Sequence, residues 1–193
     1  IFFTSNLKIP KDKIEEFLIF CDDNFPSRIL LKKDNEFELI DFLVKQRAIN
    51  IHAGVSPYYR GSATNIWPII NQELQYIGMT VHHINEGIDS GGIILQGRPA
   101  LTETDNSHTM ACKNTILSAG LMIKVVKTYL STGKVPSYEQ DLSLGKQYFF
   151  KDFNLDTVIE LYRLLNNGIV KEYLNKPKEI EIEKKDYKNL KKD

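Results

Sequence analysis

The sequence contains little cysteine: its 193 residues include only Cys21 and Cys112. These two lie far apart and lack C-x-x-C spacing, so the sequence predicts neither a disulfide framework nor a zinc site. No apolar run approaches the roughly 20 residues that span a bilayer, and we identify no signal peptide. We therefore expect a cytoplasmic protein without a membrane partner and without a bound metal.

Net charge is also absent, because 25 Lys and Arg residues balance 25 Asp and Glu residues. A nucleic-acid-binding domain usually has a basic face, so we expect no nucleic-acid partner. The hydrophobic fraction, 42%, is sufficient for a packed core. The length fits one domain, which we place over residues 1–175, followed by a charged tail over residues 176–193. The first residue is Ile1, not Met, and we expect the natural start to be missing.

Apolar periodicity predicts an alternation of strands and helices. The expected strands or extended segments are 1–4, 28–31, 47–52, 79–84 and 93–101, and the expected helices are 11–20, 37–44, 63–71, 107–130 and 155–166. Pro68 requires the helix over 63–71 to start late or to kink. Strands that alternate with helices predict an α/β fold: a mainly parallel sheet with helices on both faces.

Two polar side chains end the strand predicted over residues 47–52. Asn50 and His52 are two residues apart, so they project from the same face of a strand. An amide can donate to a developing oxyanion, and an imidazole can move a proton near neutral pH. A turn with a surface histidine is the commoner explanation of such a pair taken alone.

A glycine-rich loop over residues 87–92 contains Asp89, whose carboxylate could orient a nearby imidazole or act as a local turn cap. His82 and His83 precede this loop on a predicted strand. Adjacent residues of a strand point to opposite faces, so these two imidazoles diverge and make poor metal ligands.

Together these features resemble the core motif of the 10-formyltetrahydrofolate-dependent formyltransferase family. The family pattern is Asn-x-His, a proline loop that often ends in Arg-Gly, a helix, Gly-x-Thr/Ser-x-His, and an acidic-Gly-x-Asp-x-Gly loop. The matching positions here are Asn50, His52, Pro57, Arg60, Gly61, Gly78, Thr80, His82, Glu86, Gly87, Asp89 and Gly91.

The resemblance implies a Rossmann-like fold, a transferase activity and 10-formyltetrahydrofolate as co-substrate, without a metal. It also implies that Asn50, His52 and Asp89 are catalytic. The residues expected to bind or support the folate site are Thr80, His82, Glu86, Gly87 and Ile88. The residues expected to contact the substrate are Ser56, Tyr58 and Arg60. Tyr58, Tyr59 and Trp67 could stack on a base or sugar, or pack the loop onto the domain.

Family members usually carry about twice as many residues before the Asn-x-His motif as this chain does, so we expect part of the N-terminal half to be lacking. The tail after Lys176 is short and of mixed charge, which does not favour tRNA as the acceptor. The leading expectation is a small-molecule amine, such as an amino sugar nucleotide. A formyltetrahydrofolate deformylase and a non-catalytic folate- or nucleotide-binding remnant remain alternatives, and a homodimer remains open.

Overall fold

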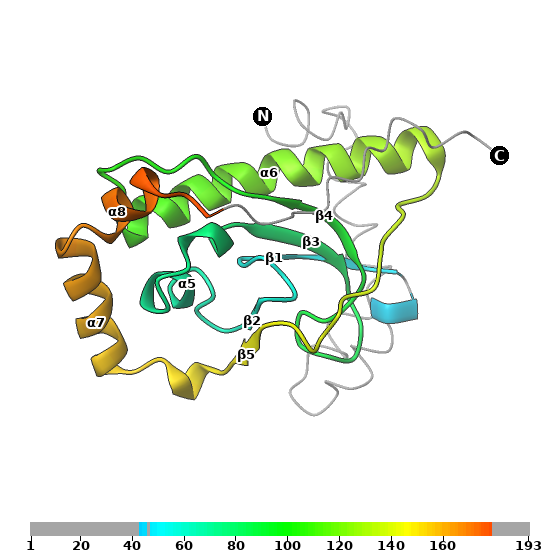
Figure 1. Cartoon of the computed structure of the whole chain (residues 1–193). Helices are drawn as coiled ribbons and strands as arrows, with labels where there is room; N and C mark the ends of the chain where they lie inside the picture. Colours follow the sequence, from blue (N-terminus) through cyan, green and yellow to red (C-terminus); the bar gives the residue numbers. More distant parts are fainter. Residues whose placement is uncertain (1–42, 46, 179–193) are drawn as a thin grey trace, which may run out of the picture. The chain divides into compact units, whose positions relative to one another are not determined.

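The structure, a computed structural model, describes residues 43–45 and 47–178 (Figure 1). The chain divides into two compact units, Ile1–Leu43 and Val44–Asp193, and almost all described residues belong to the second. The elements predicted over residues 1–31 lie outside the described residues, as does most of the helix predicted over 37–44, of which Leu43–Lys45 are seen to be helical. The end of the charged tail, residues 179–193, also lies outside them.

Three of the predicted strands form one sheet. β1 (Ile49–His52), β3 (Met79–His83) and β4 (Ile93–Gly97) lie in the order β1-β3-β4. The α/β class is confirmed, but both pairings in this sheet are antiparallel, where we expected mainly parallel strands. The reason lies in the connections: residues 84–92 turn the chain directly back, and residues 53–78 contain a three-residue strand and only short helices. A parallel pair needs a longer crossover, usually through a full helix.

A second, two-stranded sheet was not predicted. β2 (Tyr59–Gly61) pairs in parallel with β5 (Lys146–Tyr148). Each strand has three residues, too few for alternation to be recognised in a sequence. The pairing fastens the loop that follows β1 to a segment almost ninety residues further along the chain.

The long helix α6 (Ser107–Thr132) covers one face of the three-stranded sheet (Figure 1). Asn106 caps its first turn with a side-chain oxygen, and Gly133 ends it in a left-handed conformation, so the helix predicted over 107–130 is confirmed and runs two residues further. The buried residues between α6 and the sheet are Met79, Val81, Ile94, Leu121 and Val125.

Shorter helices complete the described part. They are α5 (Trp67–Ile70), η2 (Leu74–Tyr76), η3 (Phe150–Asp152), α7 (Leu155–Asn166) and α8 (Ile169–Asn175). Pro68 lies in the first turn of α5, so the helix predicted over 63–71 starts late. A second core joins these helices to the start of α6 through Ile69, Leu74, Ile77, Met110, Leu161, Leu164, Ile169 and Val170. Among the helices of the described residues, none is both long enough and apolar enough to cross a membrane.

Candidate active site

The sheet face opposite α6 is polar. The register pairs Asn50 with His82 and His52 with Thr80, and alternation directs these four side chains to the same side. The apolar residues that alternate with them belong to the core beneath α6. The structure therefore turns Asn50 and His52 to one face, as their spacing predicts.

Asp89 reaches this face from the loop between β3 and β4. Its backbone is left-handed, with φ 47°, a conformation that costs a non-glycine residue on the order of 1 kcal/mol. Three contacts hold the residue there. The Gly61 N–H donates to Asp89 Oδ2 at 2.9 Å, and Gln140 Nε2 donates to the carbonyls of Asp89 and Gly91 at 2.9 and 2.7 Å.

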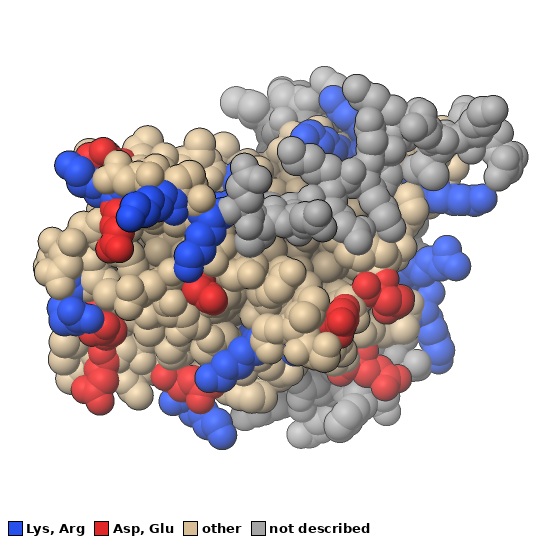
Figure 2. All heavy atoms as spheres, viewed as in Figure 1, with Lys and Arg blue, Asp and Glu red and all other residues tan. Residues whose placement is uncertain are grey.

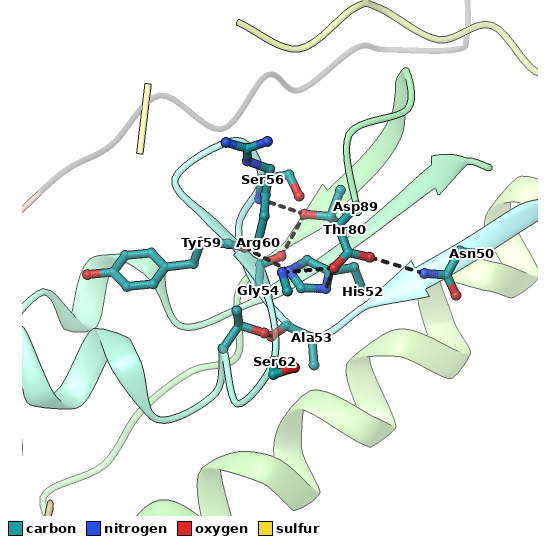
Figure 3. Close-up of polar contacts among 12 residues, drawn as sticks. Asn50, His52, Ala53, Gly54, Ser56, Tyr59, Arg60, Ser62, Thr80 and Asp89 are labelled. Carbon is teal, nitrogen blue, oxygen red and sulfur yellow. Dashed lines mark hydrogen bonds and ion pairs between the residues drawn. The ribbon is translucent and has the colours of Figure 1, made fainter. Parts of the chain in front are cut away.

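The predicted catalytic residues meet around the Asp89 carboxylate (Figure 3). His52 Nδ1 lies 3.1 Å from Asp89 Oδ2. Asn50 Nδ2 and His82 Nε2 lie 3.4 Å from Asp89 Oδ1. His52 is buried, whereas Asn50 is exposed. Two segments 37 residues apart in sequence, at positions 52 and 89, thus form one site.

This environment favours the ionised form of Asp89. Burial alone would raise the pKa of its carboxyl, but hydrogen bonds from His52 and His82, the charge of His52 and the Gly61 N–H lower it further than burial raises it. The net result is a pKa well below the ordinary value of 3.8. Asp89 is therefore a fixed anion at neutral pH.

The second ring nitrogen of His52 is also occupied. Nε2 donates to the Tyr59 carbonyl at 2.7 Å, in a buried contact. A carbonyl only accepts, so the ring nitrogen that contacts it is the one that donates. In this structure Nε2 can donate to another acceptor only by releasing the Tyr59 carbonyl. Asn50 is the member of the trio whose side chain is open to solvent.

Thr80, expected to line the folate site, is fully buried, at 0% exposure. Its hydroxyl donates to the Gly54 carbonyl and accepts from Ser56 N–H and Gln96 Nε2. These three hydrogen bonds occupy the Thr80 hydroxyl within the chain, so Thr80 fixes the loop after β1. His82, which is also buried, supports Asp89 from the neighbouring strand, the other role that we considered for it.

The remaining folate-site candidates lie on the surface. Glu86, Gly87 and Ile88 are exposed, and Ile88 is 49% exposed although it is apolar. The Asn85 side chain shapes this turn, because its oxygen accepts from Gly87 N–H and from the Ser90 hydroxyl. This part of the loop is accessible to a ligand and lies beside Asp89 in the chain.

The three substrate candidates occupy the loop after β1. Ser56 and Arg60 are buried, at 1% and 8% exposure. Tyr58 is half-buried, and its ring lies 4.5 Å from that of Tyr76, centroid to centroid. Trp67 is buried and stacks on Tyr148, so Trp67 packs the loop onto the domain rather than facing a ligand.

A polar network behind this loop could not be identified from the sequence. The Tyr59 hydroxyl donates to Glu73 at 2.5 Å, and Asn71 Nδ2 donates to the hydroxyls of Tyr59 and Tyr148. Burial, and then the Glu73 carboxylate, raise the pKa of the Tyr59 phenol. The network holds the Tyr59 residue whose carbonyl accepts from His52.

The trio is not accompanied by a group of metal ligands in the described residues. None of their His, Cys, Asp and Glu side chains form a group of three or more suited to a metal ion. A cavity of about 790 Å³ lies between the β1 edge and the end of α6, lined among others by Ile49, His83 and Tyr129. None of the trio's residues lines this cavity.

Comparison with known families gives two matches. Residues 38–126 match a family model described as formyl transferase, and residues 1–49 match one described as BamP, C-terminal domain. The first match includes all three residues of the trio.

Curated relatives include methionyl-tRNA formyltransferases. That of Thermodesulfovibrio yellowstonii is 38% identical over 82 residues, which are 42% of this chain and 26% of the relative. That of Azobacteroides pseudotrichonymphae is 40% identical over 99 residues, 51% of this chain and 30% of the relative. This chain thus spans about a quarter to a third of the length of these relatives.

Solved structures give similar matches. A 4-N formyltransferase from Francisella tularensis superposes with a TM-score of 0.53 at 29% identity, covering 64% of this chain and 55% of that one. The formyltransferase PseJ from Anoxybacillus kamchatkensis superposes with a TM-score of 0.55 at 26% identity, covering 69% and 67%. The latter structure contains UDP-4,6-dideoxy-4-formamido-L-AltNAc and tetrahydrofolate.

Proposed function

We propose that this chain transfers a formyl group from 10-formyltetrahydrofolate to an amine, because its residues 38–126 match the formyl transferase family model and resemble methionyl-tRNA and sugar formyltransferases. The observation that carries the proposal is the convergence of Asn50, His52 and Asp89 within 3.1–3.4 Å. The reaction needs donors for an oxyanion and a fixed charge beside them, and these three side chains supply both.

The chemistry begins when the neutral amine attacks the formyl carbon. The carbonyl oxygen becomes an oxyanion, the C–N10 bond breaks, and a proton passes from the amine to N10. Asn50 Nδ2 is exposed and donates to the oxyanion. His52 becomes the second donor when the formyl oxygen replaces the Tyr59 carbonyl at Nε2. Asp89 keeps the imidazolium oriented through Nδ1.

The surface turn at Glu86, Gly87 and Ile88 is the proposed contact for the pterin of the co-substrate. It is exposed and adjacent in the chain to Asp89, so a ring held there would place its N10 group near the trio. Solved relatives support the co-substrate, because one was determined with folinic acid and another with tetrahydrofolate.

For the acceptor we propose a small amine, with an amino sugar nucleotide as the first choice. The support comes from the structures of relatives with dTDP-3-aminofucose and with a UDP-linked formamido sugar. On the face shown in Figure 2, acidic and basic side chains of the described residues are interspersed rather than gathered by sign. An interspersed surface is weakly suited to a polyanion.

Methionyl-tRNA is the second candidate acceptor, because the curated relatives are methionyl-tRNA formyltransferases. Water is the third, and it would make the protein a deformylase. The same trio serves each acceptor, so the acceptors have to be separated by assay.

The test measures tetrahydrofolate formation from 10-formyltetrahydrofolate with no amine, with dTDP-3-aminofucose and with methionyl-tRNA. We expect amine-dependent turnover that falls about 10²–10⁴-fold in His52→Ala. The matched control is His83→Ala on the neighbouring strand β3, since the His83 side chain lies on the opposite face of the sheet from His52 and should leave turnover unchanged. Turnover without any amine would favour the deformylase, and a fully active His52→Ala would refute the proposed site.

A further inference from the structure

Arg60 is buried without an ionic partner. Its residue is 8% exposed, yet no carboxylate of the described residues lies within 4 Å of its guanidinium. Its hydrogen bond in the described part of the chain runs from Nε to the Pro57 carbonyl at 3.2 Å. The four terminal N–H groups of the guanidinium thus have no acceptor among these residues.

A cation with so little exposed surface and no ionic partner is unfavourable in free energy. A guanidinium stays charged at any physiological pH, and a buried charge is normally paired or bound to a ligand. The contrast with other cations is clear: Lys113 pairs with Asp105, and Arg163 pairs with Glu160, although both cations are more exposed than Arg60. The terminal nitrogens of Arg60 are not among the fully buried unpartnered atoms, so an anion supplied from outside the chain can reach them.

A second unsatisfied group lies in the same segment. Ser56 is 1% exposed, and its hydroxyl oxygen has no hydrogen-bond partner. Its backbone is fully engaged, because the N–H donates to Thr80 Oγ1 and the carbonyl accepts from Gln96 Nε2. Buried hydroxyls are normally bonded. The Arg60 hydrogen bond to Pro57 ties the arginine side chain to the residue next to Ser56.

The position of Arg60 links it to the trio. Its two chain neighbours contact the ion pair directly, since the Tyr59 carbonyl accepts from His52 and the Gly61 N–H donates to Asp89. The Arg60 side chain leaves the backbone between them, and Figure 3 shows its guanidinium directed away from the imidazole and carboxylate. An anion bound there would lie within the reach of one arginine side chain from the reaction centre.

We propose that Arg60, with the Ser56 hydroxyl, forms a subsite for an oxyanion group, a phosphate or a carboxylate, of a substrate. This inference rests on the proposed function. It adds that one of the two substrates carries an anionic group that binds at Arg60 while its reacting atoms lie at the trio. Arginine suits the purpose, because its planar donors match two oxygens of a phosphate or a carboxylate. The anion has two possible sources, the acceptor or the glutamyl carboxylate of the folate.

The test uses inorganic phosphate as the probe, with the whole chain in a phosphate-free buffer. Binding is followed by calorimetry and by the rise in thermal midpoint that a ligand of the native state produces. We expect saturable binding that weakens about tenfold or more in Arg60→Gln and less in Arg60→Lys, which keeps the charge. Ser56→Ala should weaken it by a smaller factor. Arg163→Gln is the matched control, because Arg163 is exposed on α7, is already paired with Glu160, and should leave phosphate binding unchanged.

A second variant separates a binding arginine from a structural one. Arg60→Met removes an unpaired buried charge, so without phosphate its thermal midpoint should equal or exceed that of the wild type, and phosphate should no longer raise it. A lower midpoint combined with an undiminished response to phosphate would overturn the proposal. Phosphate binding equal to the wild type in Arg60→Gln would overturn it as well.

Folinic acid identifies the source of the anion. If the acceptor supplies it, phosphate still binds when folinic acid is saturating. If the folate supplies it, phosphate competes with folinic acid, and Arg60→Gln weakens folinic acid. Phosphate binding requires no turnover, so a chain that binds phosphate but transfers no formyl group would refute the proposed function alone. A chain that transfers the formyl group but shows no Arg60-dependent anion binding would refute this subsite alone.

Discussion

Replacing Gln140 by Met should reduce formyl transfer although Gln140 contacts none of the trio's side chains. Its Nε2 donates to the backbone carbonyls of Asp89 and Gly91, at 2.9 and 2.7 Å, and so holds the left-handed backbone that aims the carboxylate at His52. Methionine keeps the length and volume of the side chain but removes the donor.

The magnitude follows from the bonds that are lost. Two neutral hydrogen bonds contribute about 1–3 kcal/mol together. The Gln140 oxygen is buried without a partner, so its removal offsets roughly 1 kcal/mol of that loss. We therefore expect global stability to fall by at most about 2 kcal/mol. Without these bonds the left-handed strain at Asp89, on the order of 1 kcal/mol, also favours displacement of the loop, so kcat should fall about tenfold or more.

The assay compares kcat, KM for folate and urea-unfolding midpoints of the wild type and Gln140→Met. Gln75→Met provides the matched control, since Gln75 is also buried with an unpartnered oxygen but lies in η2, away from Asp89. The control should retain full kcat. A folded Gln140→Met with kcat within twofold of the wild type would show that other contacts position Asp89.

Three further predictions concern the same site. Asp89→Asn should be less stable than the wild type at neutral pH. Because the folded pKa of Asp89 lies below 3.8, the extra stability of the wild type is complete above that pH and declines as the pH falls below it. Measuring the stability of both proteins as a function of acid pH will test this. Gly61→Ala should impair folate turnover, because φ is +92° there and a Cβ would collide with the Tyr148 carbonyl; steady-state kinetics will test this. Thr80→Val, which removes three buried hydrogen bonds, should destabilise the fold by about 2–4 kcal/mol in urea unfolding.

The sequence was sufficient to predict the elements that carry the trio. Apolar periodicity predicted the strands that become β1 and β3, and it predicted α6 over residues 107–130. The order of Asn50, His52 and Asp89 predicted a shared site, since each sits at a strand end or in the following loop. These signals are local, so a single sequence contains them.

The features that the sequence did not predict depend on contacts between distant segments. The antiparallel direction of the sheet follows from how the loops turn, and three-residue strands such as β2 and β5 leave no periodic signal. The contact of His52 with the Tyr59 carbonyl involves a backbone atom, which any residue at position 59 would provide. Gln140 bonds to a loop some fifty residues away, and its own surroundings in the sequence give no indication of this role.

The central claim is that His52 and Asp89 act as one unit, and a double-mutant cycle tests it most directly. Amine-dependent formyl transfer would be measured for His52→Ala, Asp89→Ala and the double variant. Residues that act as a unit give losses that do not add. The account predicts that the double variant is about as slow as the slower single variant. Losses that multiply, so that each residue contributes independently of the other, would contradict it.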